Sequence, residues 1–135
     1  MPADVSVILP TYEEHDNIGP LIEGIASAVP GLKEIIVVDD DSPDETWRVA
    51  EEMRGSFAAL QVIRRTNDRG LTSAIRDGVR ASTGDVLVWM DCDLSMRPTD
   101  IPRLIERRLR AKLKIGNILT RQYYVAIKMF PDTPI

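Results

Sequence analysis

Residues 86–95 have the sequence VLVWMDCDLS, in which a short apolar run is followed directly by two carboxylates. The run Val86–Met90 predicts a buried strand that delivers Asp91 and Asp93 to its carboxyl end. Because side chains alternate along a strand, we expect both carboxylates on one face and Cys92, as a core residue, on the other. Like charges about 4 Å apart repel by ~4 kcal/mol at an effective dielectric near ~20, so a cation is expected to offset them.

Carboxylate oxygens suit Mg²⁺ or Mn²⁺, and Mg²⁺ commonly completes its shell with water and substrate phosphate. Asp91 and Asp93 are therefore predicted to be catalytic residues that hold a metal-bound diphosphate. The alternative is a solvated acidic turn, because a D-x-D pattern also occurs by chance.

Apolar runs of the same kind recur on the amino-terminal side of this segment. They predict strands at Val5–Leu9, which Pro10 should end, at Ile35–Val38 and at Leu60–Ile63. Apolar residues at helical spacing predict a helix after each of the four strands, at positions 18–25, 49–53, 71–79 and 101–109. This order predicts an α/β fold with a mostly parallel sheet flanked by helices.

Ligands of such sheets bind outside the carboxyl ends of the strands. Polar sequences follow three of the predicted strands, namely PTYEE (10–14), DDDSPD (39–44) and DCDLS (91–95), and we expect them to line one crevice. In the second cluster, Ser42, Pro43 and Glu45 fit a capping box that begins the next helix. Asp39 and Asp40 are then the candidate ligand contacts.

The composition of the 135-residue chain is that of one ordinary globular domain, with 44% hydrophobic and 28% charged residues. The single cysteine excludes an intrachain disulfide and favours a reducing compartment. No signal peptide or membrane-spanning run is evident, so we expect a cytoplasmic protein. His15 is the only histidine and is expected in a polar loop, so the sequence gives no basis for Ser-His-Asp or Cys-His catalysis.

Charge is unevenly distributed along the chain. Residues 1–100 carry 9 basic and 19 acidic side chains, whereas residues 101–135 carry 8 and 2. Binding of a phosphate backbone needs a basic footprint, so nucleic acid is not expected as a partner of the main body.

Four blocks in order resemble the inverting GT-A glycosyltransferases of family 2, and within them the dolichol-phosphate mannose synthase branch. The resemblance covers about residues 4–106. The blocks are VSVILPTYEEHDNI (5–18), EIIVVDDDSPDETW (34–47), RRTNDRGLTSAIRDGVRASTGDV (64–86) and VWMDCDLSMRPTDIPRLIE (88–106).

The resemblance implies a truncated GT-A (Rossmann-like) fold and assigns roles to individual residues. The implied nucleotide-binding residues are Pro10, Tyr12, Glu14, Asp39 and Asp40. The implied metal ligands are Asp91 and Asp93, and the implied donor-proximal residues are Ser95, Arg69 and Gly70. Relatives often carry glutamine at the position of Ser95 and asparagine at that of Glu13, so these two contacts differ here.

The implied reaction is metal-assisted and inverting transfer of mannose from GDP-mannose to a polyprenyl phosphate such as dolichyl phosphate, with a UDP-sugar as the other candidate donor. A phosphate acceptor is already anionic, so the reaction does not require a histidine base.

Residues 107–135 do not align with the resembled family, and we expect a nucleotide-sugar-binding part at 1–106 followed by a divergent basic tail. A truncated or frame-shifted copy of this kind would bind the donor but transfer sugar slowly. A helical projection places Arg103, Arg107, Arg110 and Lys114 opposite Ile101, Ile105, Leu109 and Leu113. The basic face would either contact an anionic membrane peripherally, on its cytoplasmic side, or be solvated while the helix packs on the core.

Two other functional classes stay open at this point. One is a non-catalytic nucleotide-binding fragment. The other is a response-regulator receiver domain, because Asp39, Asp40 and Asp91, with Met96 and Pro98, imitate its acidic site. The complete βα unit before the acid pair and the second acid at Asp93 count against a receiver.

Overall fold

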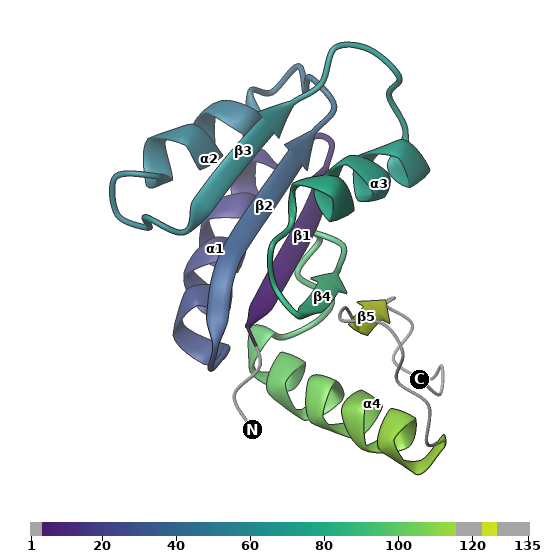
Figure 1. Cartoon of the computed structure of the whole chain (residues 1–135). Coiled ribbons are helices and arrows are strands. Elements are labelled where there is room, and N and C mark those ends of the chain that lie inside the picture. Colours follow the sequence, from purple (N-terminus) through teal and green to yellow (C-terminus); the bar gives the residue numbers. More distant parts are fainter. Residues whose placement is uncertain (1–3, 116–122, 127–135) are drawn as a thin grey trace.

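The fold is a parallel sheet with helices on both faces, described here from a computed structural model of the chain (Figure 1). The structure describes residues 4–115 and 123–126; for Leu109 and the residues after Arg110 it describes the backbone only. The five strands have the spatial order β3-β2-β1-β4-β5. They are β1 (Val5–Thr11), β2 (Leu32–Asp39), β3 (Leu60–Arg64), β4 (Val86–Trp89) and β5 (Tyr123–Ala126). The helices are α1 (His15–Ala28), α2 (Thr46–Met53), α3 (Leu71–Ala81), the 3-10 turn η1 (Pro98–Asp100) and α4 (Ile101–Ile115). The predicted α/β class is therefore confirmed.

Alternation along the central strand β1 divides the core into two layers. Val5, Val7 and Leu9 pack in the larger layer with α1, α2 and α4, whereas Ile8 packs in the smaller layer with Ala74 of α3. Figure 1 shows α1 and α2 on one face of the sheet and α3 on the other. Each side of β1 is thus covered by helices, as expected for a parallel strand that is apolar on both faces.

The order of the strands reverses at β1, which lies between β2 and β4. In open parallel sheets, ligands bind at the carboxyl ends of the strands beside such a reversal. The loops after β1 and β4 therefore flank the expected binding crevice, and the loop after β2 lies next to them.

Strand β1 continues through Pro10, contrary to the prediction that this proline ends the strand. The backbone N–H of Met90 donates to Ile8 O (3.2 Å), so alternate residues of β1 turn their polar backbone groups towards β4. Pro10, two residues after Ile8, faces the same way, but β4 has already ended at Trp89. The missing N–H of Pro10 consequently costs no ladder hydrogen bond.

The boundary expected at residue 106 falls inside α4, and β5 pairs in parallel with β4. Along α4, Ile101 and Ile105 are buried while Arg103, Arg107 and Arg110 are exposed. The apolar face of this helix therefore packs on the core, and its basic face is turned outward over this part of the helix. The side chains of Leu109, Leu113 and Lys114 lie outside the described part. Among the described residues, no helix combines the length and apolar character that a bilayer crossing requires.

Candidate functional site

Strained backbone conformations gather at the carboxyl ends of the strands. Within the described ranges, the non-glycine residues with positive φ are Glu13 (57°), Asp41 (54°), Glu45 (59°), Asp68 (54°) and Leu94 (61°). All five lie in the loops that follow β1, β2, β3 and β4. Such conformations persist where surrounding contacts hold them, and they are concentrated at functional sites. The backbone thus marks the edge of the sheet that the sequence indicated.

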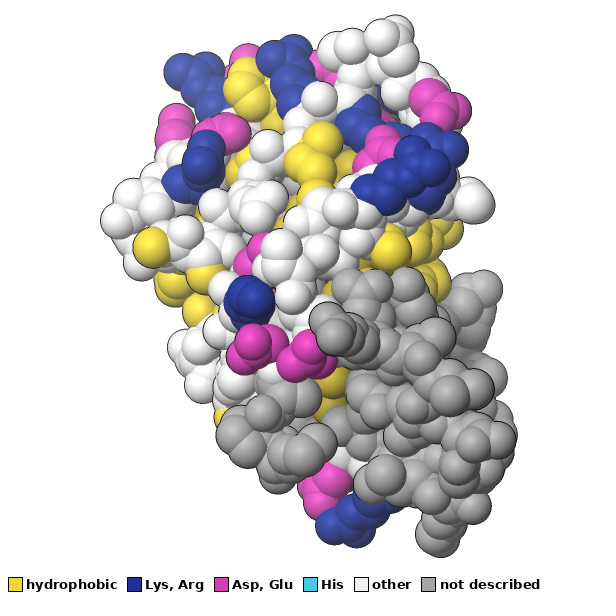
Figure 2. Space-filling model, in the orientation of Figure 1, with side chains coloured by type: hydrophobic (Ala, Val, Ile, Leu, Met, Phe, Trp, Pro, Cys, Tyr) yellow, Lys and Arg dark blue, Asp and Glu magenta, His cyan; other side chains and the backbone are white. Residues whose placement is uncertain are grey.

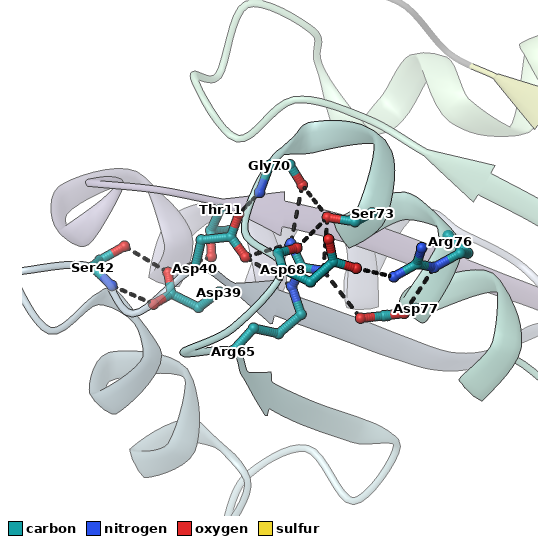
Figure 3. Close-up of polar contacts among 10 residues, drawn as sticks. All are labelled: Thr11, Asp39, Asp40, Ser42, Arg65, Asp68, Gly70, Ser73, Arg76 and Asp77. Carbon is teal, nitrogen blue, oxygen red and sulfur yellow. Dashed lines mark hydrogen bonds and ion pairs between the residues drawn. The ribbon is translucent and has the colours of Figure 1, made fainter.

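At the end of β2, the carboxylate of Asp39 is fully buried and bonded within the protein. It accepts hydrogen bonds from the Thr11 hydroxyl (2.6 Å), the Ser42 hydroxyl (2.7 Å) and the Ser42 backbone N–H (2.8 Å) (Figure 3). Asp39 thereby fastens the loop after β2 to the end of β1. A direct contact of Asp39 with base or ribose stays a prediction.

The capping box expected at Ser42 is wrong. Helix α2 begins at Thr46, after a left-handed Glu45, and the Ser42 hydroxyl instead donates to Asp39 and accepts from the Glu13 N–H (2.9 Å). Asp44 caps the first turn by accepting from the Thr46 N–H (3.1 Å). Burial raises the pKa of Asp44, but hydrogen bonds from Thr46 and His15 outweigh that effect and lower it. The Ser42 hydroxyl is therefore bonded to the buried carboxylate of Asp39 and does not cap α2.

Asp40 forms an ion pair with Arg65, whose side chain is only 5% exposed (Figure 3). Asp40 Oδ1 lies 2.8 Å from Arg65 Nε and 2.6 Å from Nη2, and Asp40 Oδ2 accepts the Gly70 N–H at 2.8 Å. Burial would lower the pKa of the guanidinium, but Asp40 and Asp77 raise it above its ordinary value, so Arg65 stays charged. Direct contact of Asp40 with a nucleotide stays a prediction.

The remaining predicted nucleotide contacts lie around the end of β1. Pro10 is buried, Glu14 is half-buried and Tyr12 is 48% exposed. The Arg69 guanidinium lies 5.3 Å from the centroid of the Tyr12 ring, so the loop before α3 reaches the loop after β1. Gly70 has φ 137°, which only glycine adopts readily, and this allows the chain to turn into α3.

Beyond β4, Cys92 is buried in the core as predicted, while Asp91 is half-buried and Asp93 exposed. Asp93 accepts hydrogen bonds from the hydroxyl and the backbone N–H of Ser95, and these lower its pKa. The protein itself therefore favours the charged form of Asp93. That a cation offsets the repulsion within the acid pair stays a prediction.

The thiol of Cys92 is buried in the core just beyond the end of β4. Burial raises its pKa, and the negative charges of Glu14, Asp91, Asp93 and Asp39 raise it further. Strands β2, β1 and β4 are adjacent and parallel, so the loops at their carboxyl ends lie at one edge of the sheet, as the sequence indicated. The thiol is unreactive in this setting, because the thiolate is strongly disfavoured.

A divalent cation fits this donor set if a substrate completes its coordination. Within the described residues, no three His, Cys, Asp or Glu side chains form a self-sufficient metal site. Mg²⁺ is usually held by one or two carboxylates together with substrate phosphates and water. Asp93, accessible and stabilised as a carboxylate, and its neighbour Asp91 provide that minimal set.

Charges of both signs surround this end of the molecule. Figure 2 shows Lys and Arg interspersed with Asp and Glu over the upper ends of β2 and β3 and over α3. Among the coloured, described residues of this face, Lys and Arg do not form the continuous basic surface that nucleic acids require. A separate groove of about 530 Å³ lies between α1 and α2 and is lined by Glu23, Val49 and Met53, among others. Judged from the direction in which these helices run, the groove lies nearer the amino ends of the strands than the candidate site does.

Arg65 and Thr11 were not singled out from the sequence, although both hold the loops of the site. A signal for Arg65 exists in strand alternation, because it shares the side of Ile63, which packs in the α3 layer. Arg64 takes the other side and lies 3.9 Å from the centroid of the Trp47 ring. For Thr11 we find no comparable local signal.

Residues 6–124 match the sequence profile described as glycosyl transferase family 2. The match extends beyond residue 106, where the resemblance found in the sequence ended. It supports the glycosyltransferase resemblance over the receiver alternative. The dolichol-phosphate mannosyltransferase of Pyrococcus furiosus is 50% identical over 103 residues, which are 76% of this chain and 29% of that protein.

Solved structures are similar in fold and sequence. A mannosyltransferase from Pyrobaculum calidifontis in complex with GDP-Man and Mn²⁺ has a TM-score of 0.64 and 30% identity, covering 69% of this chain and 28% of that chain. Glucosyl-3-phosphoglycerate synthase from Mycobacterium tuberculosis, in complex with Mn²⁺, UDP and its product, has a TM-score of 0.61 and 26% identity, covering 77% and 39%. The chain therefore spans well under half the length of each of these relatives.

Proposed function

Because this chain belongs to glycosyl transferase family 2, we propose that it binds a nucleotide sugar, GDP-mannose, at the carboxyl ends of β1, β2 and β4. The observation that carries this proposal is that β2, β1 and β4 are adjacent parallel strands, so the loops that carry Glu14, Asp39, Asp91 and Asp93 lie at one edge of the sheet. The relative solved with GDP-Man and Mn²⁺ supports the choice of donor. The mannosyltransferase from Pyrococcus furiosus supports a dolichyl or other polyprenyl phosphate as the acceptor.

We assign the nucleotide to the surface formed by Pro10, Tyr12 and Glu14, with Asp39 and Asp40 behind it. The diphosphate would then extend towards Asp91 and Asp93, which hold Mg²⁺ or Mn²⁺. A cation is required there, because a diphosphate that faced the carboxylates of Asp91 and Asp93 alone would be repelled. Arg69 and Gly70 on one side and Ser95 on the other lie beside the donor.

The proposed reaction is a single in-line displacement. A phosphate oxygen of the acceptor forms a bond to the anomeric carbon of mannose while the bond from that carbon to the diphosphate breaks, and GDP leaves with the electron pair. A cation held by Asp91 and Asp93 would offset the negative charge that develops on the departing diphosphate. The acceptor oxygen is anionic from the start, so no side chain of this chain has to remove a proton.

Isothermal titration with GDP-mannose, GDP and UDP-glucose, each with Mn²⁺, Mg²⁺ or excess EDTA, tests donor binding. We expect GDP-mannose to bind with either metal and its affinity to fall at least tenfold in EDTA, as loss of one multidentate contact would cause. Asp91→Asn and Asp93→Asn should lower affinity in the same way. Asp85→Asn is the matched control, because Asp85 precedes β4 at the opposite end of the strand. Equal binding with and without EDTA would overturn the proposal.

Transfer by this chain alone is proposed to be slow, because the aligned part covers only 28–39% of these relatives. Positioning an acceptor in line can contribute roughly 7–11 kcal/mol to catalysis, and groups outside this chain would supply part of it. Radiolabelled mannose transfer to a polyprenyl phosphate should be weak for this chain and restored by joining a relative's following segment after Glu106. Rapid turnover by the unmodified chain would contradict this, and would exclude the alternative of a non-catalytic nucleotide-binding fragment.

We further propose a cytoplasmic location with peripheral membrane contact through the exposed arginines of α4. Arg103 and Arg110 pair with Asp100 and Glu106, and the helix is still strongly basic. Sedimentation with phosphatidylglycerol vesicles should retain the chain at low salt and release it at high salt. Arg103→Gln combined with Arg107→Gln should weaken retention, whereas equal retention on phosphatidylcholine vesicles would contradict an electrostatic contact.

A further inference from the structure

The loop between β3 and α3 reaches Tyr12, which follows β1, and contains no buried apolar side chain. Its residues 66–70 are all exposed, and the segment includes Arg69, which stacks on Tyr12. A loop without buried apolar side chains has little local stability of its own. Its position must therefore come from polar contacts.

One of these contacts comes from a buried side chain, Arg65, which also bonds to the elements on either side of the loop (Figure 3). The carboxylate of Asp68 is held separately by Arg76 on α3. Besides its ion pair with Asp40, Arg65 donates to Ser73 Oγ (3.0 Å) and Asp77 Oδ2 (3.0 Å) on α3 and to the backbone oxygen of Gly70 (3.0 Å). One guanidinium thus joins the end of β2, the first turns of α3 and the end of the loop.

The loop is closed by a second contact to the same ion pair. The Gly70 N–H donates to Asp40 Oδ2, while the Gly70 oxygen accepts from Arg65, so both polar groups of this residue are held by the pair. Ser73 adds a hydrogen bond to the backbone oxygen of Asp68. Residues 68–70 are therefore fixed on both sides of Arg69.

We propose that Arg65 is a positioning residue for the nucleotide sugar: by holding the 66–70 loop against Asp40 and α3, it sets Arg69 over Tyr12 at the edge of the donor site. The inference rests on the proposed function. Arg65 is almost inaccessible, so it acts through Arg69 and does not touch the donor itself.

The test is a double-mutant cycle on GDP binding in the presence of Mn²⁺, with Arg65→Lys and Arg69→Ala. Lysine keeps the charge but cannot donate through a planar fork to Asp40, Asp77 and Gly70 together. We expect Arg65→Lys to weaken binding about tenfold, the lower end of the cost of losing an orienting residue behind a ligand site. In the Arg69→Ala background the same substitution should have little further effect, because the group that it positions is gone.

Hydrogen exchange provides a readout that does not depend on the nucleotide. Amides of residues 66–70 should exchange faster in Arg65→Lys while β1 and β2 are unchanged. Arg54→Lys is the matched control, because it alters an exposed ion pair with Glu51 on α2 (3.3 Å) and should change neither measurement. If Arg65→Lys does not fold, Ser73→Ala, which removes one Arg65 contact and the bond to Asp68, takes its place in the cycle.

The outcomes separate the two proposals. Additive effects of Arg65→Lys and Arg69→Ala, or faster exchange of the loop with unchanged GDP affinity, would overturn the positioning role and leave the proposed function intact. Failure of the unmodified chain to bind GDP or GDP-mannose would overturn the proposed function, and the positioning role with it. Non-additive loss of affinity with faster loop exchange supports the positioning role.

Discussion

Replacement of Gly70 by alanine tests how strongly the backbone of the 66–70 loop is constrained. Gly70 has φ 137° and ψ 159°, a region that is essentially restricted to glycine and costs other residues about 1–3 kcal/mol. An added Cβ would meet only Ser73 Oγ, at 3.9 Å, so the cost is conformational and not steric. Against it stands the lower entropy of the unfolded alanine chain, worth about 0.4–1 kcal/mol.

The net expectation for Gly70→Ala is a loss of about 1–2 kcal/mol in the free energy of unfolding, since the strain exceeds the entropic gain. If the chain instead rotates to a negative φ, the hydrogen bond to Asp40 is lost. A buried carboxylate deprived of a donor costs a similar ~1–3 kcal/mol. Either response should also weaken GDP binding, because the loop that carries Arg69 moves.

Urea unfolding followed by tryptophan fluorescence measures the stability, and titration with GDP and Mn²⁺ measures the binding. Gly55→Ala is the matched control, because no atom lies within 4 Å of its added Cβ and its φ is not positive. That variant should be neutral or slightly more stable. Equal stability of the two alanine variants would refute the backbone argument.

Three further substitutions probe other parts of the molecule. In Gly78→Ala the new Cβ would lie 2.4 Å from Ile8 Cγ2 in the core. The cost of overpacking, about 1–3 kcal/mol, should exceed the ~1 kcal/mol gain in helix propensity, so the melting temperature should fall. A raised melting temperature in thermal unfolding would contradict this. Glu34→Gln should lower the free energy of unfolding by about 1–3 kcal/mol, because the buried carboxylate accepts hydrogen bonds from Ser6, Thr83 and Gln61. The affinity for GDP should stay unchanged. A changed affinity would show that this cluster reaches the site. Arg65 lowers the pKa of Asp77 below the ordinary 3.8, so Asp77 adds stability above pH 3.8 that is lost as the pH falls through its lowered pKa. In acid urea titrations, the difference in unfolding free energy between the unmodified chain and Asp77→Asn should therefore shrink over that range. A constant difference would contradict the assignment.

The sequence predicted the elements whose signal is local and apolar. Four strands and four helices follow from β-branched runs and helical spacing, and Cys92 follows from alternation. The extension of β1 through Pro10 could not be predicted, because it depends on where β4 ends, a property of the neighbouring strand. Ser42 was misassigned for a similar reason: a capping box is a local pattern, but Asp39 competes for the same hydroxyl from the end of β2.

The site was predicted at the level of loops and less completely at the level of contacts. Strand ends indicate where carboxylates gather, since parallel strands share one carboxyl edge. Burial of Arg65 depends on partners from β2 and α3 that are distant in sequence, Asp40 and Asp77. The strand β5 lies beyond residue 106, where the resemblance found by reading the sequence ended, so its pairing with β4 was not predicted.

The position of β1 between β2 and β4 has a consequence for the order of folding. Pairing β1 with β2 closes a segment that contains only α1, whereas the register Val5 with Val86 closes a segment that contains α1, β2, α2, β3 and α3. Closure of a longer loop costs more chain entropy before any contact repays it, and contacts between distant residues form slowly. The loops after β1 and β2 are therefore expected to come together early in folding, and the acidic loop after β4 is expected to join them late. Under the proposed function, the surface assigned to the nucleotide would form before the two carboxylates assigned to the metal are in place.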